Sequence, residues 1–341
     1  MKSYHVAIVG ATGMVGQEFI KLLQQRNFPM ASISLYSSDR SAGKRLYVGH
    51  REIEVKETAP ESFQNVDIVL FSAGAEISKM FSPIAARSGA LVIDNSAAFR
   101  MEPKVPLVVP EINPEDIKAH EGIVANPNCS TIQMVVAVYP LHKVNPIKRI
   151  VVSTYQSVSG TGAAAMEELT TQTKLVLDGQ NVVPHVYPHQ IGFNILPEID
   201  VFLDSGYTKE EGKMVEETRK IMHAPDIAIS ATCVRVPVFI GHSEAINIEF
   251  TDPMSPEDAR QILSKAPGVK VLDDPSVSLY PMPWLAAGSD DVYVGRIRSD
   301  ASHPRGLVMW VVSDNLRKGA ALNAIQIAEE AARREWFKSS K

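Results

Sequence analysis

The chain has 341 residues, of which 45% are hydrophobic and 21% charged, so it is long enough to bury the cores of about two domains. Its formal net charge of −5 and its scattered lysines and arginines argue against a nucleic-acid-binding surface. Two cysteines are too few for a disulfide framework, and no apolar run reaches the roughly 18 residues that span a bilayer. We therefore expect a cytoplasmic protein without a nucleic-acid or membrane partner.

The first predicted element is an apolar strand at Tyr4–Val9, which runs directly into a glycine-rich turn. Residues 18–24 follow as a helix with one apolar face. Strand, glycine turn and helix together are typical of a dinucleotide-binding unit, in which the backbone approaches a pyrophosphate held at the helix N-terminus. The alternative is a purely structural turn. The predicted cofactor contacts are Gly10, Thr12, Gly13, Met14, Val15 and Gly16.

The second strand, Ile33–Tyr36, ends where an NAD-binding protein carries an acidic residue for the ribose hydroxyls. Here the chain continues as Ser37, Ser38, Asp39, Arg40, Ser41. Hydroxyl groups beside a guanidinium suit a 2′-phosphate, so we predict NADP as the cofactor. Asp39 lies near the acidic position of NAD enzymes, and the register of the loop decides whether it faces the ribose or water. A solvated polar loop is the other interpretation.

Further apolar strands are expected at residues 68–71, 91–95, 107–109 and 123–125, separated by helical or turn-rich segments. This alternation predicts an α/β fold with a Rossmann-type, doubly wound sheet. Arg100 comes a few residues after one of these strands, at the edge where such sheets bind ligands. A guanidinium there could hold a phosphate or a carboxylate through two hydrogen bonds.

Cys129 lies in the sequence Asn-Pro-Asn-Cys-Ser-Thr-Ile-Gln, between an apolar strand and an apolar helix predicted at Thr131–Val138. Asn128 can cap this helix, which places Cys129 at the helix N-terminus. The helix dipole there favours the thiolate and can lower the thiol pKa from about 8.5 by one unit or more. The position predicts a nucleophile, whereas the alternative is a small residue that only packs.

The second half of the chain predicts an α+β domain with a mostly antiparallel sheet, because its strands are longer and rich in β-branched residues. These strands are expected at residues 150–155, 234–238, 245–250, 292–297 and 307–312. A long, irregular, glycine-containing segment at residues 160–204 could cover a dimer interface or the active site. A final helix at residues 316–337 is expected to return to the first domain. We thus predict a cofactor domain at 1–129 completed by 315–341, and a catalytic and dimerisation domain at 130–314.

Several polar residues of this second half are candidate partners for the cysteine. His242 is expected at the end of a strand, next to a glycine, and histidine exchanges protons near neutral pH. Arg235 lies in an apolar strand, where a charge needs a carboxylate partner from the protein or from a substrate. Glu210 and Lys213 have helical i,i+3 spacing and could equally form a solvated ion pair.

Two other features point to no additional chemistry. His185 and His189 have a spacing that could present two metal ligands on a helix, but Pro188 lies between them and disfavours that helix. We therefore predict no metal site. Cys233 lies beside Val234 in an apolar strand and is expected to be an inert core thiol.

Taken together, these motifs closely resemble the aspartate-semialdehyde dehydrogenase family, and the resemblance covers essentially the whole chain. Asn-Pro-Asn-Cys-Ser-Thr-Ile-Gln is similar to the nucleophile segment of this family, whereas the related N-acetyl-glutamyl-phosphate reductases usually carry a Pro-Gly-Cys-Tyr type of sequence. The resemblance implies that Cys129 is the nucleophile and His242 the acid and base. It also implies that Gln156 orients the substrate or acyl group and that Asn128 assists beside the nucleophile.

The same resemblance implies roles for the charged residues in substrate binding. Arg235 is expected to pair with the substrate α-carboxylate, and Glu210 to contact its amino group. Arg100 and Lys213 are expected to hold the phosphate. On the cofactor side, the resemblance places a group of residues around the NADP 2′-phosphate, and Asn315 near the nicotinamide. The 2′-phosphate group comprises Ser37, Ser38, Arg40 and Ser41.

The implied reaction is the NADPH-dependent conversion of L-aspartyl-4-phosphate to L-aspartate-4-semialdehyde, and its reverse, in the biosynthesis of lysine, threonine, methionine and isoleucine. A thiolate that attacks an acyl phosphate expels phosphate and leaves a thioester, which hydride then reduces to an aldehyde. Two alternatives stay open, an N-acetyl-gamma-glutamyl-phosphate reductase and a non-catalytic relative that serves as an interaction protein. The resemblance also implies a homodimer.

Overall fold

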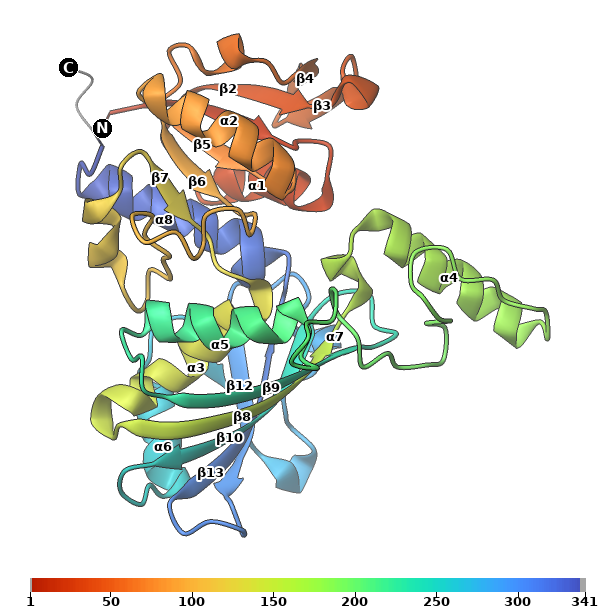
Figure 1. The fold of residues 1–341 in the computed structure, drawn as a ribbon, viewed down its shortest axis with the longest axis vertical. Helices are drawn as coiled ribbons and strands as arrows, with labels where there is room; N and C mark the ends of the chain where they lie inside the picture. The colour runs from red at the N-terminus through yellow and green to blue at the C-terminus, as the bar shows by residue number, and fades with distance from the viewer. Residues whose placement is uncertain (1, 338–341) are drawn as a thin grey trace. The chain divides into compact units, whose positions relative to one another are not determined.

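The structure of the protein is a computed structural model that describes residues 2–337, and it divides the chain into two compact units (Figure 1). The first unit contains the chain up to Asn128 and from Ala320 onward, and the second unit is Cys129–Gly319. Our predicted divisions fell after residues 129 and 314. None of the helices described is long and apolar enough to cross a membrane.

The first unit contains a seven-stranded sheet with the order β3-β4-β2-β1-β5-β6-β7. All its neighbouring strands are parallel except β3 and β4, which pair antiparallel. The strands are β1 Tyr4–Val9, β2 Met30–Ser37, β3 Arg45–Val48, β4 Arg51–Glu57, β5 Ile68–Phe71, β6 Leu91–Asp94 and β7 Ile123–Ala125. The helices are α1 Met14–Gln25, α2 Ala75–Arg87 and α8 Leu322–Arg333.

Both faces of this sheet are covered, because alternate residues of one strand point into two different cores. In β1, Val6 and Ile8 belong to a core that includes residues of α1 and α8. Ala7 and Val9 belong to a second core that includes residues of α2. The predicted doubly wound α/β fold is therefore confirmed.

Two expectations for the first unit were wrong. Residues 107–109 do not form a strand, and only Leu107 pairs, as an isolated bridge to Ala125. The hairpin of β3 and β4 was missed because its sequence is mostly charged. In β4, Val55 is the one fully buried residue, and the apolar alternation of the strand is limited to Ile53 and Val55.

The second unit contains a six-stranded mixed sheet with the order β11-β12-β13-β10-β8-β9. Its central pairs, β12–β13, β13–β10 and β10–β8, are antiparallel, whereas the edge pairs β11–β12 and β8–β9 are parallel. The strands are β8 Ile147–Gln156, β9 Ala228–Arg235, β10 His242–Phe250, β11 Val269–Val271, β12 Val292–Ser299 and β13 Gly306–Ser313. The helices are α3 Cys129–Val144, α4 Ala163–Leu177, α5 Lys209–Ile221, α6 Pro256–Leu263 and α7 Pro283–Ala286.

Helix α3 packs on strands β8, β10, β12 and β13 and lies between α5 and α6. It is apolar on all sides, and most of its residues are buried. Such a helix has its position fixed by the surrounding core. The residue at its start, Cys129, is therefore held rigidly relative to the sheet of the same unit.

The predicted irregular segment at residues 160–204 contains a helix, α4, that stands out from the rest of the second unit (Figure 1). Its side chains organise the loop that follows it. Glu168 accepts hydrogen bonds from the backbone N–H groups of residues 185–187, and Gln172 accepts from those of Ile191 and Gly192. The segment is thus a helix with an ordered return loop.

Two predicted boundaries of the second unit were shifted. The strand expected at residues 234–238 ends at Arg235, because Pro237 has no N–H to continue the ladder. His242 consequently begins β10 and does not end a strand. The last helix was expected from residue 316, but residues Arg317–Ala321 form a π-helical turn before α8 starts at Leu322.

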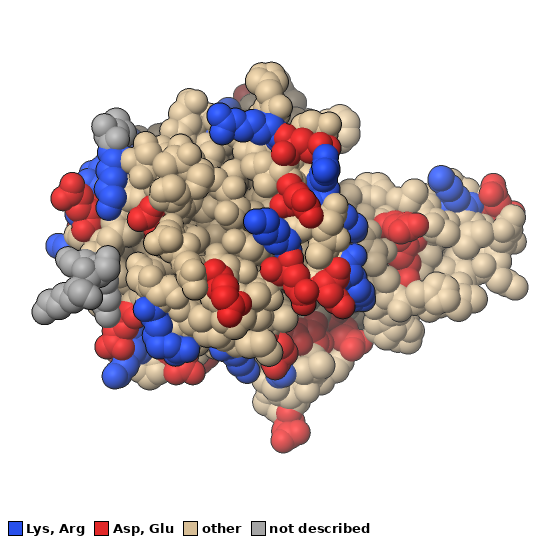
Figure 2. All heavy atoms as spheres, turned by 90° about the horizontal axis from the view of Figure 1, so that it is seen from above, with Lys and Arg blue, Asp and Glu red and all other residues tan. Residues whose placement is uncertain are grey.

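Short 3-10 turns connect these elements. They are η1 Asp39–Ser41, η2 Pro60–Phe63, η3 Pro114–Ala119, η4 Val158–Gly160 and η5 Pro275–Val277. On the face drawn in Figure 2, basic and acidic side chains are interspersed and no continuous basic stripe is visible.

Candidate active site

The glycine turn after β1 is packed so closely that two of its positions require glycine. Gly10 has φ +86°, and a Cβ there would lie 2.3 Å from the carbonyl oxygen of Ser72. A Cβ at Gly16 would lie 2.2 Å from the carbonyl oxygen of Gly10. Gly13 directly precedes α1, and its N–H donates to the Gly10 oxygen at 3.0 Å. The turn therefore brings bare backbone and a helix N-terminus to the same place.

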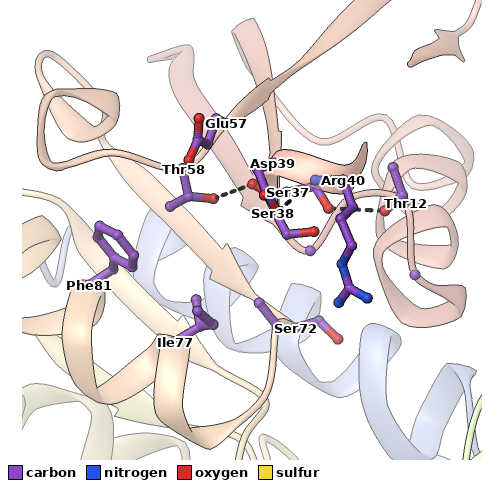
Figure 3. A pocket seen from close by; sticks show the side chains of 13 residues that line it. Thr12, Ser37, Ser38, Asp39, Arg40, Glu57, Thr58, Ser72, Ile77 and Phe81 are labelled. Carbon is purple, nitrogen blue, oxygen red and sulfur yellow. Dashed lines mark hydrogen bonds between the residues drawn. The ribbon is translucent and has the colours of Figure 1, made fainter. Parts of the chain in front are cut away.

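A cavity of about 620 Å³ opens in front of this turn (Figure 3). Its lining contains two predicted glycines and polar residues from the ends of β2 and β4. The lining residues are Gly10, Thr12, Gly13, Ser37, Ser38, Asp39, Arg40, Glu57, Thr58, Ser72, Ala73, Ile77 and Phe81. Because a helix N-terminus and a cation face one cavity, it suits a ligand with several phosphate groups.

The loop after β2 is fixed by its own hydrogen bonds. The Thr12 and Ser37 hydroxyl groups lie 3.0 Å apart, and the Asp39 carboxylate accepts the N–H of Arg40 at 2.7 Å. Asp39 is thus engaged with the backbone of its own loop. Figure 3 shows the Arg40 side chain extending along the cavity. This arrangement gives the guanidinium access to a ligand.

Not every predicted cofactor residue lines this cavity. Met14, Val15 and Gly16 begin α1 behind the turn, and Ser41 ends η1 beside it. Sequence reasoning in turn missed the apolar pair of Ile77 and Phe81 from α2, and the polar pair of Glu57 and Thr58. These residues come from segments without a recognisable motif.

Cys129 is the first residue of α3 and is partly exposed. The helix has 16 residues, so the dipole at its N-terminus favours a thiolate at this position. A Cβ at Gly319 would lie 3.0 Å from the Cys129 Cβ, so glycine is needed opposite the nucleophile candidate. Gly319 was missed, although a glycine inside a predicted helix is the kind of signal that marks close packing.

Cys233 provides the contrast expected for a core thiol. It is fully buried in β9, and its sulfur contacts the Met214 sulfur at 3.7 Å. Burial, together with the negative charge of Glu210, raises the pKa of this thiol far above its usual range. It therefore stays protonated at neutral pH.

His242 is fully buried at the start of β10, where its ring is held by the chain after β8. The Ser157 N–H donates to the ring Nδ1 at 3.0 Å, and the Ser157 hydroxyl lies 3.1 Å from the same atom. The Asn315 side-chain oxygen accepts hydrogen bonds from the Ser157 hydroxyl at 3.1 Å and from the Gly241 N–H at 2.9 Å. Burial, with Arg235 nearby, holds the pKa of His242 well below its usual range.

Asn315 was predicted beside the nicotinamide, and the structure gives its side chain a different set of partners. Besides Ser157 and Gly241, its oxygen accepts from the Ser159 hydroxyl at 3.2 Å. Asn315 is therefore the centre of a buried network behind His242. The nicotinamide contact stays a prediction.

Arg235 ends β9 and lies beside the same glycine as His242. Its Nη1 donates to the Ser157 carbonyl oxygen at 2.7 Å, and its guanidinium lies over the Tyr187 ring at 5.9 Å from the centroid. A Cβ at Gly160 would lie 3.1 Å from Arg235 Nη1 and 3.3 Å from His242 Nε2. Gly160 thus leaves room in front of both side chains.

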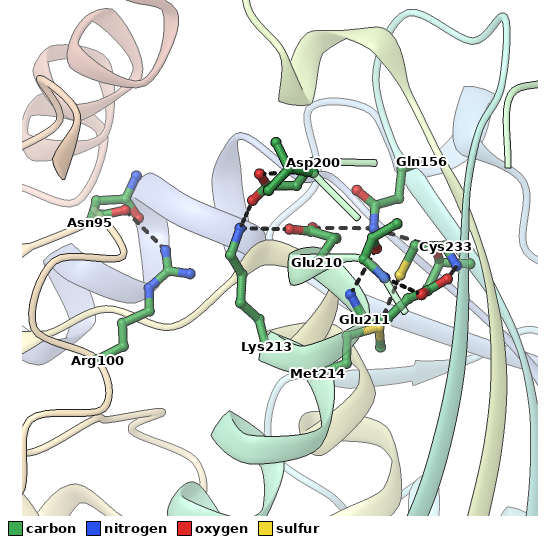
Figure 4. Close-up of polar contacts among 12 residues, drawn as sticks. Asn95, Arg100, Gln156, Asp200, Glu210, Glu211, Lys213, Met214 and Cys233 are labelled. Carbon is green, nitrogen blue, oxygen red and sulfur yellow. Dashed lines mark hydrogen bonds and ion pairs between the residues drawn. The ribbon is translucent and has the colours of Figure 1, made fainter. Parts of the chain in front are cut away.

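Gln156, Glu210 and Lys213 come together in one chain of polar contacts (Figure 4). Gln156 Nε2 donates to Glu210 Oε1 at 3.3 Å, and Lys213 Nζ pairs with Glu210 at 3.0 Å and with Asp200 at 2.8 Å. Burial of Lys213 opposes its charge, but Glu210 and Asp200 outweigh this effect and raise its pKa. The pair is half-buried and is not the solvated surface pair that the spacing alone allowed.

The neighbouring Glu211 has a structural use. Its carboxylate accepts the N–H of Thr208 at 2.7 Å in a capping box at the start of α5, and the N–H of Cys233 at 3.0 Å. Glu211 is therefore occupied by backbone donors. Glu210 is the carboxylate that contacts Gln156 and Lys213.

The remaining predicted site residues, Arg100 and Asn128, belong to the first unit. Arg100 is buried, and its guanidinium donates to the carbonyl oxygen of Asn126 at 2.9 Å. It also donates to the carbonyl oxygen of Asn95 at 3.1 Å (Figure 4). Asn128 is buried directly before Cys129. Among the residues described, no group of three or more His, Cys, Asp or Glu side chains could hold a metal ion.

The chain is similar to known proteins over nearly all of its length. Residues 5–120 match the family described as semialdehyde dehydrogenase, NAD binding domain, and residues 138–318 match semialdehyde dehydrogenase, dimerisation domain. The aspartate-semialdehyde dehydrogenase of Aquifex aeolicus is 58% identical over 330 residues, which are 96% of this chain and 97% of that protein. The Bacillus subtilis enzyme of the same name is 52% identical over 96% of this chain and 97% of its own length.

Solved structures give the same result. Aspartate semialdehyde dehydrogenase II of Vibrio cholerae, complexed with ASA, has a TM-score of 0.94 at 46% identity, covering 98% of this chain and 99% of that one. Aspartate semialdehyde dehydrogenase of Candida albicans, with NADP, has a TM-score of 0.79 at 28% identity, covering 98% and 100%.

Proposed function

This chain belongs to the aspartate-semialdehyde dehydrogenase family, and from that premise we propose that it uses Cys129 as a covalent nucleophile and NADP as its cofactor. The reaction converts L-aspartyl-4-phosphate to L-aspartate-4-semialdehyde, or the reverse, in amino-acid biosynthesis. The observation that carries the covalent mechanism is the partly exposed thiol at the start of a 16-residue buried helix. The dipole at a helix N-terminus favours the thiolate form of a cysteine placed there.

In the reductive direction the Cys129 sulfur attacks the acyl carbon, and the bond from that carbon to the phosphate oxygen breaks. The product of this half-reaction is a thioester on Cys129 and free phosphate. Bound NADPH supplies the hydride that reduces the thioester. The backbone N–H groups at the start of α3 stabilise the negative charge that develops on the acyl oxygen.

The substrate's charges match the side chains of the second unit. Arg235 binds the α-carboxylate, since its guanidinium is buried and needs an anion to balance its charge. Glu210 receives the α-amino group, and Gln156, hydrogen bonded to Glu210, orients the acyl group. Lys213 stays cationic and is available to phosphate, a role that Arg100 shares in the proposal.

The proposal for NADP rests on the cavity in front of the glycine turn. The N-terminus of α1 and the bare backbone of Gly10 suit the pyrophosphate. Ser37, Ser38 and Arg40 supply hydroxyl groups and a cation for a 2′-phosphate. These residues therefore fit the bound cofactor.

We also propose a homodimer formed through the second unit. The loop after α4 exposes large apolar side chains, including Phe193 at 63%, Ile195 at 58% and Phe202 at 57% exposure. Exposed apolar clusters of this kind mark protein interfaces. Light scattering of the purified protein should give about twice the 37.3 kDa chain mass, and a monomer mass would reject the dimer. A cytoplasmic location stays a prediction of the composition.

One assay tests the proposed function. Purified protein is mixed with aspartate semialdehyde and inorganic phosphate, and the reduction of NADP or NAD is followed. We expect phosphate-dependent reduction of NADP. Preference for N-acetyl-glutamate semialdehyde would indicate the related reductase, and no activity with either substrate would indicate a non-catalytic relative.

A further inference from the structure

The guanidinium of Arg235 is buried, and the protein uses only part of it. Its Nη1 donates to the Ser157 carbonyl oxygen at 2.7 Å, whereas its Nε has no hydrogen-bond partner among the residues described. Buried donors without partners are rare in folded proteins. The edge that carries Nε is therefore available to a ligand, and a carboxylate binds such an edge through two parallel hydrogen bonds.

The aromatic ring of Tyr187 lies against this guanidinium. The guanidinium carbon of Arg235 lies over the ring, 5.9 Å from its centroid, which is within the range of a cation–π interaction. Burial raises the pKa of the Tyr187 hydroxyl, so Arg235 faces a neutral ring and not a phenolate. The ring thus stabilises the buried cation without taking up the N–H groups that a carboxylate needs.

The side chain of Tyr187 is fixed at both ends. Its hydroxyl donates to the Thr161 hydroxyl oxygen at 2.9 Å, and Thr161 directly follows Gly160, the glycine beside Arg235 and His242. The ring packs against an apolar cluster to which η4, α4 and the chain after α4 contribute. The buried members of this cluster are Val158, Ala165, Leu169, Ile191 and Leu196.

The backbone around Tyr187 is held by α4. Tyr187 belongs to the return loop, which we define as residues 178–208 between α4 and α5. Glu168 of α4 accepts the N–H groups of His185 and Val186 at 2.8 and 2.6 Å, directly before Tyr187. Pro188 follows, and a proline favours an extended backbone at the residue before it. The position of the ring is therefore set by the arm that α4 forms.

The return loop also pairs with the backbone of Arg235. The Leu196 N–H donates to the Arg235 carbonyl oxygen at 2.9 Å, and the Arg235 N–H donates to the Leu196 carbonyl oxygen at 2.8 Å. This bridge lies at the last residue of β9. One loop thus fixes the backbone of Arg235 through Leu196 and contacts its guanidinium through Tyr187.

From these contacts we propose that Tyr187 is a positioning residue for Arg235, and that the return loop therefore belongs to the site for the substrate α-carboxylate. The ring limits the rotation of the guanidinium and keeps its Nε edge available. The guanidinium is then ordered before the substrate binds, which strengthens binding. The proposal rests on the proposed function, in which Arg235 binds the α-carboxylate.

Steady-state kinetics of Tyr187→Leu test this role. Loss of the ring should raise KM for aspartate semialdehyde by about tenfold, because the guanidinium is no longer held. The values of kcat and of KM for inorganic phosphate should stay within about threefold of the unmodified protein, since neither depends on the carboxylate. An unchanged KM for aspartate semialdehyde, or an equal rise of both KM values, would overturn the proposal.

Two further variants separate the ring from its hydroxyl and from general packing. Tyr187→Phe keeps the aromatic face and loses only the hydrogen bond to Thr161, so KM should rise by no more than about threefold. Tyr139→Leu, in the C-terminal half of α3, is the matched control, because that ring also lies 5.9 Å from a cation, Lys143. We expect its KM to be unchanged. Equal KM values for Tyr187→Leu and Tyr187→Phe would contradict a role of the ring.

A measurement without substrate separates this proposal from the proposed function. Phenylglyoxal modifies accessible guanidinium groups, and peptide mass spectrometry gives its rate at each arginine. We expect Arg235 to react about fivefold faster or more in Tyr187→Leu, because one side of its guanidinium is uncovered. Arg100, which is buried in the first unit, should react at an unchanged rate. An unchanged rate at Arg235 would overturn the proposal.

A second substitution keeps the test decisive if Tyr187→Leu does not fold, as judged by urea unfolding. Tyr187→Met fills the same apolar site with a flexible side chain and lacks an aromatic face, so the same KM and labelling results are expected. Absence of turnover in the unmodified protein would reject the proposed function alone, since the labelling rates would still show whether Tyr187 holds Arg235.

Discussion

The sites of the two units are formed by different kinds of structural element. In the first unit, the cofactor cavity is formed by a bare backbone turn, a helix N-terminus and side chains from the loops that follow the strands, such as Thr12 and Arg40. In the second unit, buried side chains from distant segments meet, as His242, Ser157 and Asn315 do. We expect the pyrophosphate part of the first site to depend mainly on the backbone, whereas the second site depends on each side chain and its partners.

The two thiols of the second unit should give the largest difference. Cys129→Ala removes the nucleophile and is expected to lower kcat by about 10⁴-fold or more. Cys233→Ala removes a buried sulfur from the core and is expected to cost about 1 kcal/mol of unfolding free energy, with kcat retained. Steady-state kinetics and urea unfolding of both variants measure this contrast. Equal kcat losses in the two variants would contradict it.

Gly160→Ala tests the space in front of His242 and Arg235. The added Cβ would lie within 3.1–3.3 Å of both side chains, so we expect kcat/KM to fall by roughly 100-fold through their displacement. Gly212→Ala in α5 is the matched control, because a Cβ there meets nothing within 4 Å. Activity of Gly160→Ala equal to that of Gly212→Ala would show that the space is not used.

Arg40→Ala tests the side-chain contribution in the first unit. Loss of the guanidinium should weaken the binding of NADP by roughly 10- to 100-fold, because only NADP carries the 2′-phosphate. The affinity for NAD should change little. Lys44→Ala, at an exposed cation nearby in the chain, is the control. Binding of each cofactor can be followed by fluorescence titration. An equal loss of affinity for NADP and NAD would show that Arg40 does not bind the 2′-phosphate.

The smallest expected effect concerns a buried carboxyl group of the second unit. Glu244 is fully buried in β10, and burial raises its pKa well above its usual range despite the opposing effect of Gln133. The folded protein therefore holds a proton that the unfolded chain releases above about pH 4.3, so Glu244 stabilises the fold less as pH rises. As pH rises from 5 to 7, the unfolding free energy of the unmodified protein should fall. Glu244→Gln should make this fall smaller by about 1 kcal/mol per pH unit, as measured by urea unfolding. An unchanged pH slope would be inconsistent with the protonated state.

The contrast between a backbone-based site in the first unit and a side-chain site in the second unit also explains what the sequence alone could predict. The strands of the first sheet, the glycine turn and the helix start at Cys129 all have local patterns, and the predicted fold class is confirmed. The hairpin of β3 and β4 was missed because its apolar alternation is short and lies among charged residues. The end of β9 was shifted because the apolar run continues through Pro237, where the ladder stops.

The second site was less predictable because its geometry is tertiary. Nothing in the sequence around Ser157 indicates that its N–H meets a ring 85 residues away. Gly160 and Gly319 are glycines for reasons that only their neighbours reveal. Asn315 was read from a resemblance as a nicotinamide contact, and the structure shows it as the centre of a hydrogen-bond network.

The central claim, a covalent acyl group on Cys129, can be tested by intact-protein and peptide mass spectrometry. The protein is incubated with aspartate semialdehyde and NADP in the absence of phosphate and then quenched in acid, which preserves thioesters. We predict one added aspartyl group per active chain, located on the peptide that contains Cys129 and absent from Cys129→Ala. A catalytically active protein with no adduct, or with the adduct on Cys233, would contradict the account.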